Sequence, residues 1–247
     1  MGRPACAFLT LSLFLTINPA LAYTVKKIPV KESFVKSLDR GWIYTTSDYD
    51  SGTSIQAKMQ VVIEAPPEQV WELYTQNNNW KLYKIPTLVD SRALNESFVN
   101  ELKNSKVKKV RRFYSLLADR FHDPYATRHR GGKWESFAFQ YYDLPWPVDN
   151  KWLVLKQIHD ESKTSSSVFA SESFGVGGNI KSFYSSAVFK PFENNPNRTL
   201  MDYKVTVDTG YPVPKFLLAW GTEQTLPRVM KAIRRYLKTT PSPPERF

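Results

Sequence analysis

The stretch that most constrains the fold is the last long apolar one, Tyr211 to Lys238. Its apolar residues recur three and four positions apart in two successive stripes, which predicts one long helix. Gly221 and Pro227 mark the junction of the stripes, and we expect a bend there because proline lacks the amide proton of a regular helical turn. The stripes are Val213, Phe216, Leu217 and Trp220, followed by Leu226, Val229, Met230, Ile233 and Leu237.

Gln224 continues the face of the first stripe. It either ends the stripe at the surface or points into a cavity, where a buried amide requires a hydrogen-bond partner. Both interpretations stay open at the level of sequence.

Five strand-like segments at hairpin spacing precede this helix. They are Trp134 to Tyr142, Lys151 to His159, Ser165 to Ser173, Asn179 to Phe189 and Thr199 to Val207. We expect turns at Gly175, at Gly177-Gly178 and from Asn194 to Asn197. Apolar residues alternate along each strand, as in Phe137, Phe139 and Tyr141, in Phe183, Ala187 and Phe189, and in Met201, Tyr203, Val205 and Val207. The pattern predicts an α+β fold, in which a curved antiparallel sheet wraps around a single long helix.

The N-terminal part of the chain supplies the remaining predicted elements. A short helix from Val30 to Asp39 ends at Gly41, a residue suited to a helix C-cap. Two prolines at positions 66 and 67 then start another short helix, because proline is tolerated in the first helical turn. The expected order is a strand from Trp42 to Thr46, a turn from Ser47 to Gly52, a strand carrying Ile55, Ala57, Met59, Val61 and Ile63, helical turns ending near Tyr74 and Tyr83, and a strand from Thr87 to Leu94.

A basic segment separates these two halves. Ser97 to Phe121 predicts one basic amphipathic helix, within an insertion of about residues 97–133. It either packs its apolar stripe on the domain with a solvated basic face or meets lipid phosphates at a membrane. The candidate anion-contacting residues are Lys106, Lys108, Lys109, Arg111, Arg112, Arg128 and Arg130. The chain's net charge of +11 agrees with anionic partners.

The first 22 residues have the pattern of a removable export signal. Arg3 precedes an apolar run from Ala5 to Ile17, and Ala20-Leu21-Ala22 forms a small-residue cleavage site. A retained anchor is the alternative, although the apolar run is shorter than a bilayer-spanning helix. We therefore expect an exported protein, in a bacterial periplasm or secreted, with one domain over residues 23–240 and a tail over residues 241–247.

Several classes of chemistry lack a sequence signature. The single cysteine, Cys6, lies in the export signal, which excludes thiolate chemistry and disulfides from the mature chain. His122 and His129 lie among arginines, an environment that disfavours a bound cation, so we expect no metal and no cofactor. Asp143, Asp149, His159 and Glu223 are the candidates for acid-base work if a cavity holds them. No nucleic-acid readout motif is visible, and we expect a monomer that binds no nucleic acid.

The order of these features is similar to that of the START and polyketide-cyclase-like superfamily, whose members have the helix-grip fold. The matching pieces are Trp42, the run Val61 to Trp71 (VVIEAPPEQVW), Trp80, Pro145-Trp146-Pro147 and the terminal helix, which together cover about Trp42 to Lys238. The resemblance implies a sheet of about seven strands and a tunnel for a lipid, sterol or polyketide-like molecule. The chain departs from the family at Asn150-Lys151, where an Arg-Asp pair is frequent, and in its long basic insertion.

This resemblance leads to the hypothesis of an exported carrier or binder of a hydrophobic ligand, with an anionic membrane surface as a second partner. A cyclase- or dehydratase-like enzyme on the same fold is the alternative, and a domain with a filled interior is the third. The candidate tunnel walls are Phe139, Tyr141, Trp152, Phe169, Phe183, Tyr203, Val205, Leu217, Trp220 and Gln224. Ordinary core packing is the competing interpretation of each.

Overall fold

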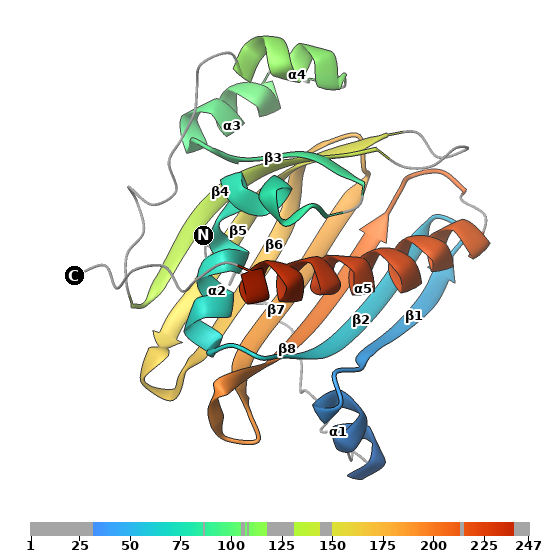
Figure 1. The fold of residues 1–247 in the computed structure, drawn as a ribbon. Coiled ribbons are helices and arrows are strands. Elements are labelled where there is room, and N and C mark those ends of the chain that lie inside the picture. Colours follow the sequence, from blue (N-terminus) through green and yellow to red (C-terminus); the bar gives the residue numbers. More distant parts are fainter. Residues whose placement is uncertain are drawn as a thin grey trace, which may run out of the picture.

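The computed structural model describes residues 32–85, 87–104, 107, 109–117, 131–143, 150–212 and 215–239. The predicted export signal and the tail lie outside these residues. The described part of the chain forms an eight-stranded antiparallel sheet in the order β1-β2-β8-β7-β6-β5-β4-β3 (Figure 1). The strands are β1 Ile43–Ser51, β2 Ser54–Ile63, β3 Leu88–Leu94, β4 Lys133–Tyr142, β5 Lys151–Lys163, β6 Val168–Gly178, β7 Ser182–Phe192 and β8 Asn195–Asp208. The predicted α+β class and antiparallel sheet are confirmed.

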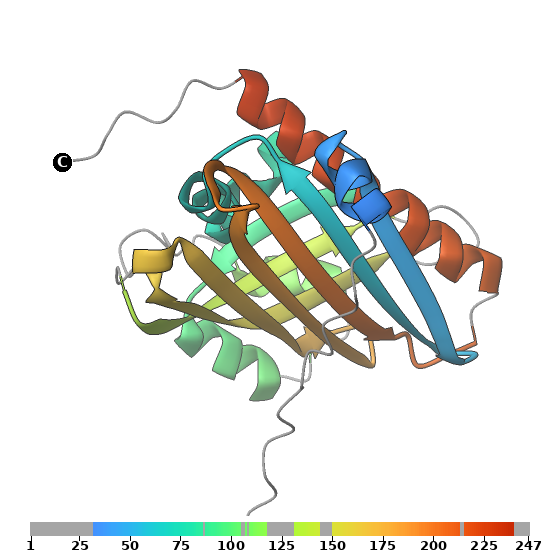
Figure 2. The same cartoon turned by 90° about the horizontal axis from the view of Figure 1, so that it is seen from below.

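The helices divide between the two faces of this curved sheet. Helices α2 and α5 lie on the concave face, and α3 and α4 lie on the convex face (Figures 1 and 2). Their bounds, with two short 3-10 turns, are α1 Glu32–Asp39, α2 Pro67–Thr75, η1 Asn77–Tyr83, α3 Glu96–Asn104, α4 Val110–Leu117, η3 Thr164–Ser166 and α5 Lys215–Thr239. The sheet therefore carries two separate apolar layers, one on each face.

The second half of α5 packs on the sheet, as predicted. Met230 and Ile233 are buried in the core of the concave face. The Arg234 guanidinium donates to the carbonyl oxygens of Gly41 and Val62, which ties the helix to the β1–β2 edge. The side chains of the first stripe lie outside the described residues, and Pro227 lies inside the helix.

Three turn predictions are wrong, for two physical reasons. Gly175, Gly177 and Gly178 all belong to β6. At Gly175 and Gly178 the neighbouring strands come too close to the backbone to leave room for a side chain. A Cβ on Gly175 would lie 3.1 Å from the Cβ of Phe183 on the neighbouring strand. The turn between β7 and β8 is shorter than predicted, since only Glu193 and Asn194 adopt left-handed φ angles of 50° and 61°, as in a two-residue hairpin. Strand β1 likewise runs through the predicted turn as far as Ser51.

The predicted single basic helix is also wrong, since the described residues form two helices, α3 and α4. Helix α3 ends at Asn104 and α4 begins at Val110, and the described residues between them, Val107 and Lys109, are not helical. Two shorter helices instead allow each apolar face to reach the sheet, so Phe98 and Phe113 are both buried there.

Helix α1 matches its prediction closely. Gly41 has a φ of +85° and donates its N–H to the Leu38 carbonyl at 2.9 Å, as expected of a glycine C-cap. The Arg198 guanidinium bridges Asp39 at 2.7 Å and Glu64 at 2.9 Å. These contacts hold α1 against the ends of β2 and β8.

Candidate functional site

One end of the concave face is closed by large apolar side chains. Strand register places Val61, Met201, Phe189 and Phe169 side by side across four neighbouring strands. Trp71 from α2 covers this row, is fully buried and stacks on Phe169 at 5.5 Å between ring centroids. The sequence supplies Trp71 at this point because the two prolines before it start α2 directly above the end of β2. The row and its tryptophan form an ordinary packed core.

In the next rows across the same face, β6 and β7 carry small, mostly polar side chains, between Tyr203 and Val205 of β8 on one side and His159 and Gln157 of β5 on the other. Ser171 lies beside Ala187, and one step further along the strands Ser173 lies beside Ser185. The three serines have at most 3% of their surface exposed. We call these three serines the serine band. Alternation along β6 could have revealed it, because Ser171, Ser173 and Gly175 occupy positions where an apolar face continues from Phe169.

Tyr74 and Tyr203 lie beside the serine band, and Tyr142 lies further along the same face. Burial raises the pKa of the Tyr74 phenol, and the neighbouring hydroxyls of Ser171 and Ser173 oppose that shift. Burial likewise raises the pKa of the phenols of Tyr142 and Tyr203. Tyr142 and Tyr203 nevertheless keep part of their side-chain surface accessible.

A hydrogen-bonded cluster follows the serine band toward β4. Asn77 donates to Gln157 Oε1 at 2.7 Å, and Ser136 Oγ lies 2.8 Å from His159 Nε2. His159 is fully buried, and its ring lies 4.0 Å from the ring of Trp134, measured between centroids. This predicted acid-base candidate is therefore enclosed by protein rather than presented to a ligand.

The other acid-base candidates are placed as follows. Asp143 is exposed beside the end of β4, and Asp149 and the Glu223 side chain lie outside the described residues. Glu161, which the sequence analysis missed, is buried and accepts a 2.7 Å hydrogen bond from Trp71 Nε1 and another from the Gly131 amide. Its contacts fix α2 to β5, a structural role.

The far end of the concave face is apolar again. Leu153 and Leu155 of β5 form a cluster with Ala138, and Ile180 and Phe183 pack against it. Tyr142 also belongs to this group and donates its hydroxyl hydrogen to Gln140 Oε1 at 2.7 Å. The concave face thus runs from a packed core through a polar band to a second apolar surface.

The predicted tunnel walls fall on both faces of the sheet. Phe169, Phe183, Tyr203 and Val205 lie on the concave face, although Phe169 is part of the packed core. Phe139, Tyr141 and Trp152 lie on the convex face beneath α3 and α4, so their prediction as walls of the same space is wrong. Alternation shows which residues share a face but not which helix covers it. The side chains of Leu217, Trp220 and Gln224 lie outside the described residues.

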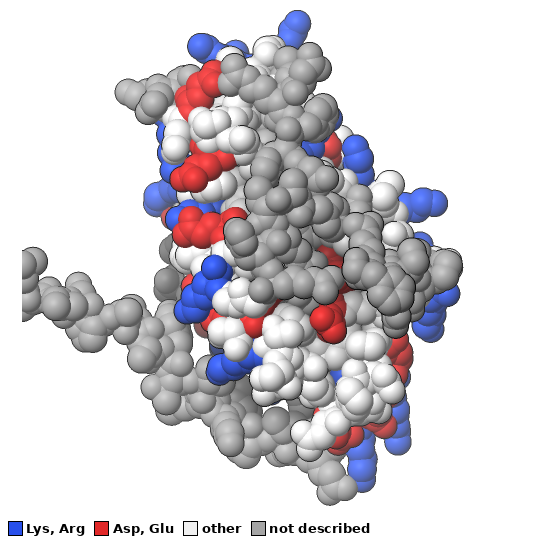
Figure 3. Space-filling view, turned by 90° about the vertical axis from the view of Figure 1, so that its left-hand side faces the viewer, with Lys and Arg blue, Asp and Glu red and all other residues white. Residues whose placement is uncertain are grey.

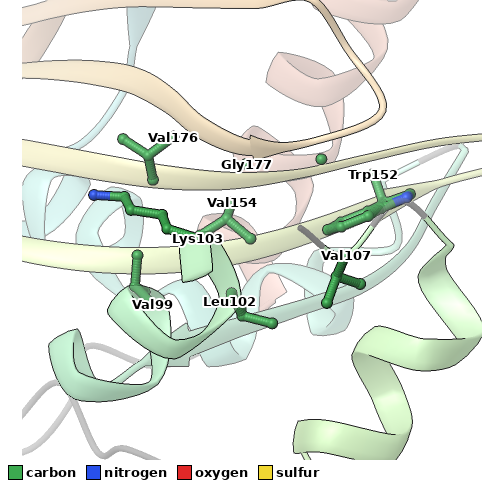
Figure 4. A pocket seen from close by; sticks show the side chains of 9 residues that line it. Val99, Leu102, Lys103, Val107, Trp152, Val154, Val176 and Gly177 are labelled. Carbon is green, nitrogen blue, oxygen red and sulfur yellow. The ribbon is translucent and has the colours of Figure 1, made fainter. Parts of the chain in front are cut away.

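On the convex face, α3 and α4 cover an aromatic layer. Phe113 stacks on Phe139 with ring centroids 4.0 Å apart, and the Tyr114 hydroxyl donates to Asp90 at 3.0 Å. Beside α3 a small hollow of about 30 Å³, partly open to solvent, remains over β5 and β6 (Figure 4). It is lined by Val99, Leu102, Lys103, Val107, Trp152, Val154, Val176, Gly177 and Gly178.

The basic residues of this region are partly described. Lys109, Arg111 and Arg112 are exposed beside or on α4, and Lys103 is exposed at the rim of the hollow. Lys106, Lys108, Arg128 and Arg130 lie outside the described residues. On the face shown in Figure 3, acidic and basic side chains are intermixed, so the described charges there do not form one continuous basic field.

Two general features complete the site. Within residues 32–239, as far as they are described, no group of three or more His, Cys, Asp or Glu side chains could hold a metal ion. In the same residues no helix is long and apolar enough to cross a bilayer.

Comparisons with known proteins place the fold. No protein-family model matches the sequence, and a search of curated proteins finds no match. Among solved structures, a STAR-related lipid transfer protein fragment from Xanthomonas axonopodis is similar with a TM-score of 0.54 and 14% identity, over 80% of this chain and 93% of that one. Human STARD10 is similar with a TM-score of 0.50 and 10% identity, over 85% of this chain and 80% of that one. The chain has the START-like helix-grip fold that its sequence resemblance predicts.

Proposed function

We propose that the protein binds a hydrophobic ligand of the lipid class between the concave face of the sheet and helix α5. The serine band supports this proposal best. A filled interior requires large, interlocking apolar side chains, and the row ending at Phe169 has them. The adjoining rows instead combine small hydroxyl side chains with partly accessible tyrosines, Tyr142 and Tyr203. Apolar walls with a few polar groups are typical of sites for small amphiphilic ligands.

The fold likeness agrees with this proposal but does not carry it, since one fold hosts many functions. One similar structure is named a lipid transfer protein. Binding or transfer in such a site requires no covalent step, because apolar burial supplies roughly 25 cal/mol per Å².

The proposal includes an exported protein that approaches an anionic membrane surface. The N-terminal pattern of residues 1–22 supports export. Exposed Lys109, Arg111 and Arg112 beside the apolar hollow of α3 support the approach to lipid, since each such cation contributes about 1 kcal/mol near an anionic surface.

Native mass spectrometry of the protein, before and after incubation with vesicles of mixed phospholipids, tests ligand binding. We expect mass adducts of lipid size that disappear on denaturation. Failure to acquire any lipid, by the protein as purified or after incubation, would contradict the proposed function.

Replacement of a serine by a large side chain distinguishes a ligand space from a filled core. Ser173→Phe fills a space if one exists, and we then expect loss of lipid adducts with little change in thermal unfolding. If the interior is filled, the same substitution overpacks it and lowers the free energy of unfolding by about 1–3 kcal/mol. Ser165→Phe, at an exposed position in η3, is the matched control.

A further inference from the structure

A buried lysine lies at the apolar end of the concave face. Lys151 begins β5, pairs with Tyr142 on β4 and has 6% of its surface exposed. Its ammonium lies 4.6 Å from the ring centroid of Tyr211, in the segment that leads into α5. The lysine is therefore placed where the edge of the concave face meets the start of the helix.

Among the residues that the structure describes, no carboxylate forms an ion pair with this ammonium. The acid at the end of β8, Asp208, is already engaged, since it contacts Lys181 Nζ at 2.9 Å and accepts the Gly210 amide at 2.8 Å. The stem of Lys151 is buried, whereas its ammonium lies over the ring of Tyr211, a residue with 38% of its surface exposed. A ring face accepts none of the ammonium hydrogen bonds in the way an anion does.

The backbone around Lys151 is held firmly in place. Asn179 Oδ1 accepts the Trp152 amide at 2.9 Å, and Asn179 Nδ2 donates to the Asn150 carbonyl at 2.9 Å. Asn150 Nδ2 in turn donates to the Tyr141 hydroxyl at 2.9 Å. These bonds fix the backbone of the residues on both sides of Lys151. The Cα of the lysine is therefore held in a defined position.

The surface next to the ammonium determines what kind of anion fits. From Lys151 inward along β5 the same face presents Leu153 and Leu155, with Phe183 packed against them. We propose that the Lys151 ammonium binds the carboxylate or phosphate head of an amphiphile whose apolar chain lies along this surface. The proposal rests on the proposed function and narrows its ligand to an anionic amphiphile.

Displacement of the neutral fluorescent probe N-phenyl-1-naphthylamine tests this assignment. Four competitors share one oleoyl or oleyl chain: oleate, oleoyl lysophosphatidate, monoolein and oleyl alcohol. We expect the wild-type protein to bind one or both anions at least about tenfold more tightly than the neutral pair, which is the low end for a hydrogen bond between charged groups. Preference for oleate identifies a carboxylate head, and preference for lysophosphatidate identifies a phosphate.

The variant Lys151→Met keeps the length of the side chain and removes the charge. We expect it to lose the anion preference while it still binds monoolein, and Lys151→Arg to restore part of the preference. Lys190→Met, at an exposed position on the convex side of β7, is the charge-matched control. Thermal unfolding of each variant checks that the fold is intact.

The outcomes separate the two proposals. Equal affinity of the wild-type protein for oleate, lysophosphatidate and oleyl alcohol would overturn the role of Lys151 and leave hydrophobic binding standing. Retention of the anion preference by folded Lys151→Met would also overturn it. If no amphiphile binds in the displacement assay, the proposed function fails, and the role of Lys151 fails with it.

Discussion

The buried tyrosines predict a steep loss of stability in alkali. Burial raises the pKa of the phenols of Tyr74, Tyr142 and Tyr203 above the value of about 10 in the unfolded chain. Below pH 10 both states hold the phenolic proton, so the stabilisation is present in full. As the pH rises above 10, the unfolded chain releases these protons first, and the free energy of unfolding falls until the folded pKa is reached.

The magnitude follows from the difference in bound protons. Consider a phenol that ionises with a pKa of about 10 in the unfolded chain but stays protonated in the folded protein. At pH 11 its ionisation lowers the free energy of unfolding by about 1.4 kcal/mol. Two such residues, Tyr74 and Tyr142, together lower the free energy of unfolding by about 3 kcal/mol between pH 9 and pH 11, and Tyr203 adds to the loss in the same direction. That is a large fraction of the 5–15 kcal/mol typical of a domain.

Urea unfolding at pH 8, 9, 10 and 11 measures this loss. Lysines also titrate in this range, so the informative quantity is the difference between the wild-type protein and the variants Tyr142→Phe and Tyr203→Phe. Tyr142→Phe should flatten the pH dependence by about 1.4 kcal/mol at pH 11, and Tyr203→Phe should flatten it in the same direction. Tyr44→Phe, at a position with 46% of its surface exposed, is the surface control.

The same experiment reports on the space beside the serine band. If that space is filled with water, the phenols of Tyr142 and Tyr203 ionise near their ordinary pKa in the folded protein. The two phenylalanine variants would then follow the pH dependence of the wild-type protein, and the argument from burial would be refuted.

Three further predictions concern other parts of the fold. Gly178→Ala should lower the free energy of unfolding by more than 1 kcal/mol in urea titrations, because the added Cβ would lie 2.3 Å from the Trp152 carbonyl oxygen; an unchanged midpoint would contradict this. A double-mutant cycle of Trp71→Phe and Glu161→Gln should give a coupling energy of about 1–3 kcal/mol for their 2.7 Å hydrogen bond, and additive effects would show that the bond contributes little. Charge reversal to Glu on α4 and at the residue before it should weaken cosedimentation with anionic vesicles at least tenfold. Reversal of as many exposed lysines elsewhere should not weaken it. Equal effects of the two sets would contradict a role of α4 in docking to the membrane. The reversed residues are Lys109, Arg111 and Arg112.

Much of the fold could be predicted from local patterns. The alternation from Ile55 to Ile63 specifies a strand, and the prolines before α2 specify the start of a helix. Both signals are local and do not depend on residues far away in the sequence. Glycines were the weak point. Gly175 and Gly178 signal a turn in isolation, but their actual role is close contact with Phe183 and Trp152, partners that only the folded sheet brings near.

The candidate site was harder to predict. Large aromatic residues such as Phe139 and Trp152 suggested a ligand surface, yet they pack against α4, part of the segment in which the sequence predicted one basic helix with its packing left open. The residues on which the proposed ligand site rests are small or charged, namely the serine band and Lys151. The role of these residues depends on how closely other side chains pack around them. A hydrophobic pattern in the sequence does not show that packing.

The alternation of β5 makes the two proposed roles separable by experiment. Trp152 and Val154 point to the convex hollow beside α3, whereas Lys151 and Leu153 belong to the concave face. Charge reversal on α4 and Lys151→Met therefore change groups on opposite sides of the sheet that share no described contact. Their effects on lipid acquisition from vesicles should be additive as free energies. A larger effect in the combined variant would indicate that β5 transmits membrane contact on one face to ligand binding on the other.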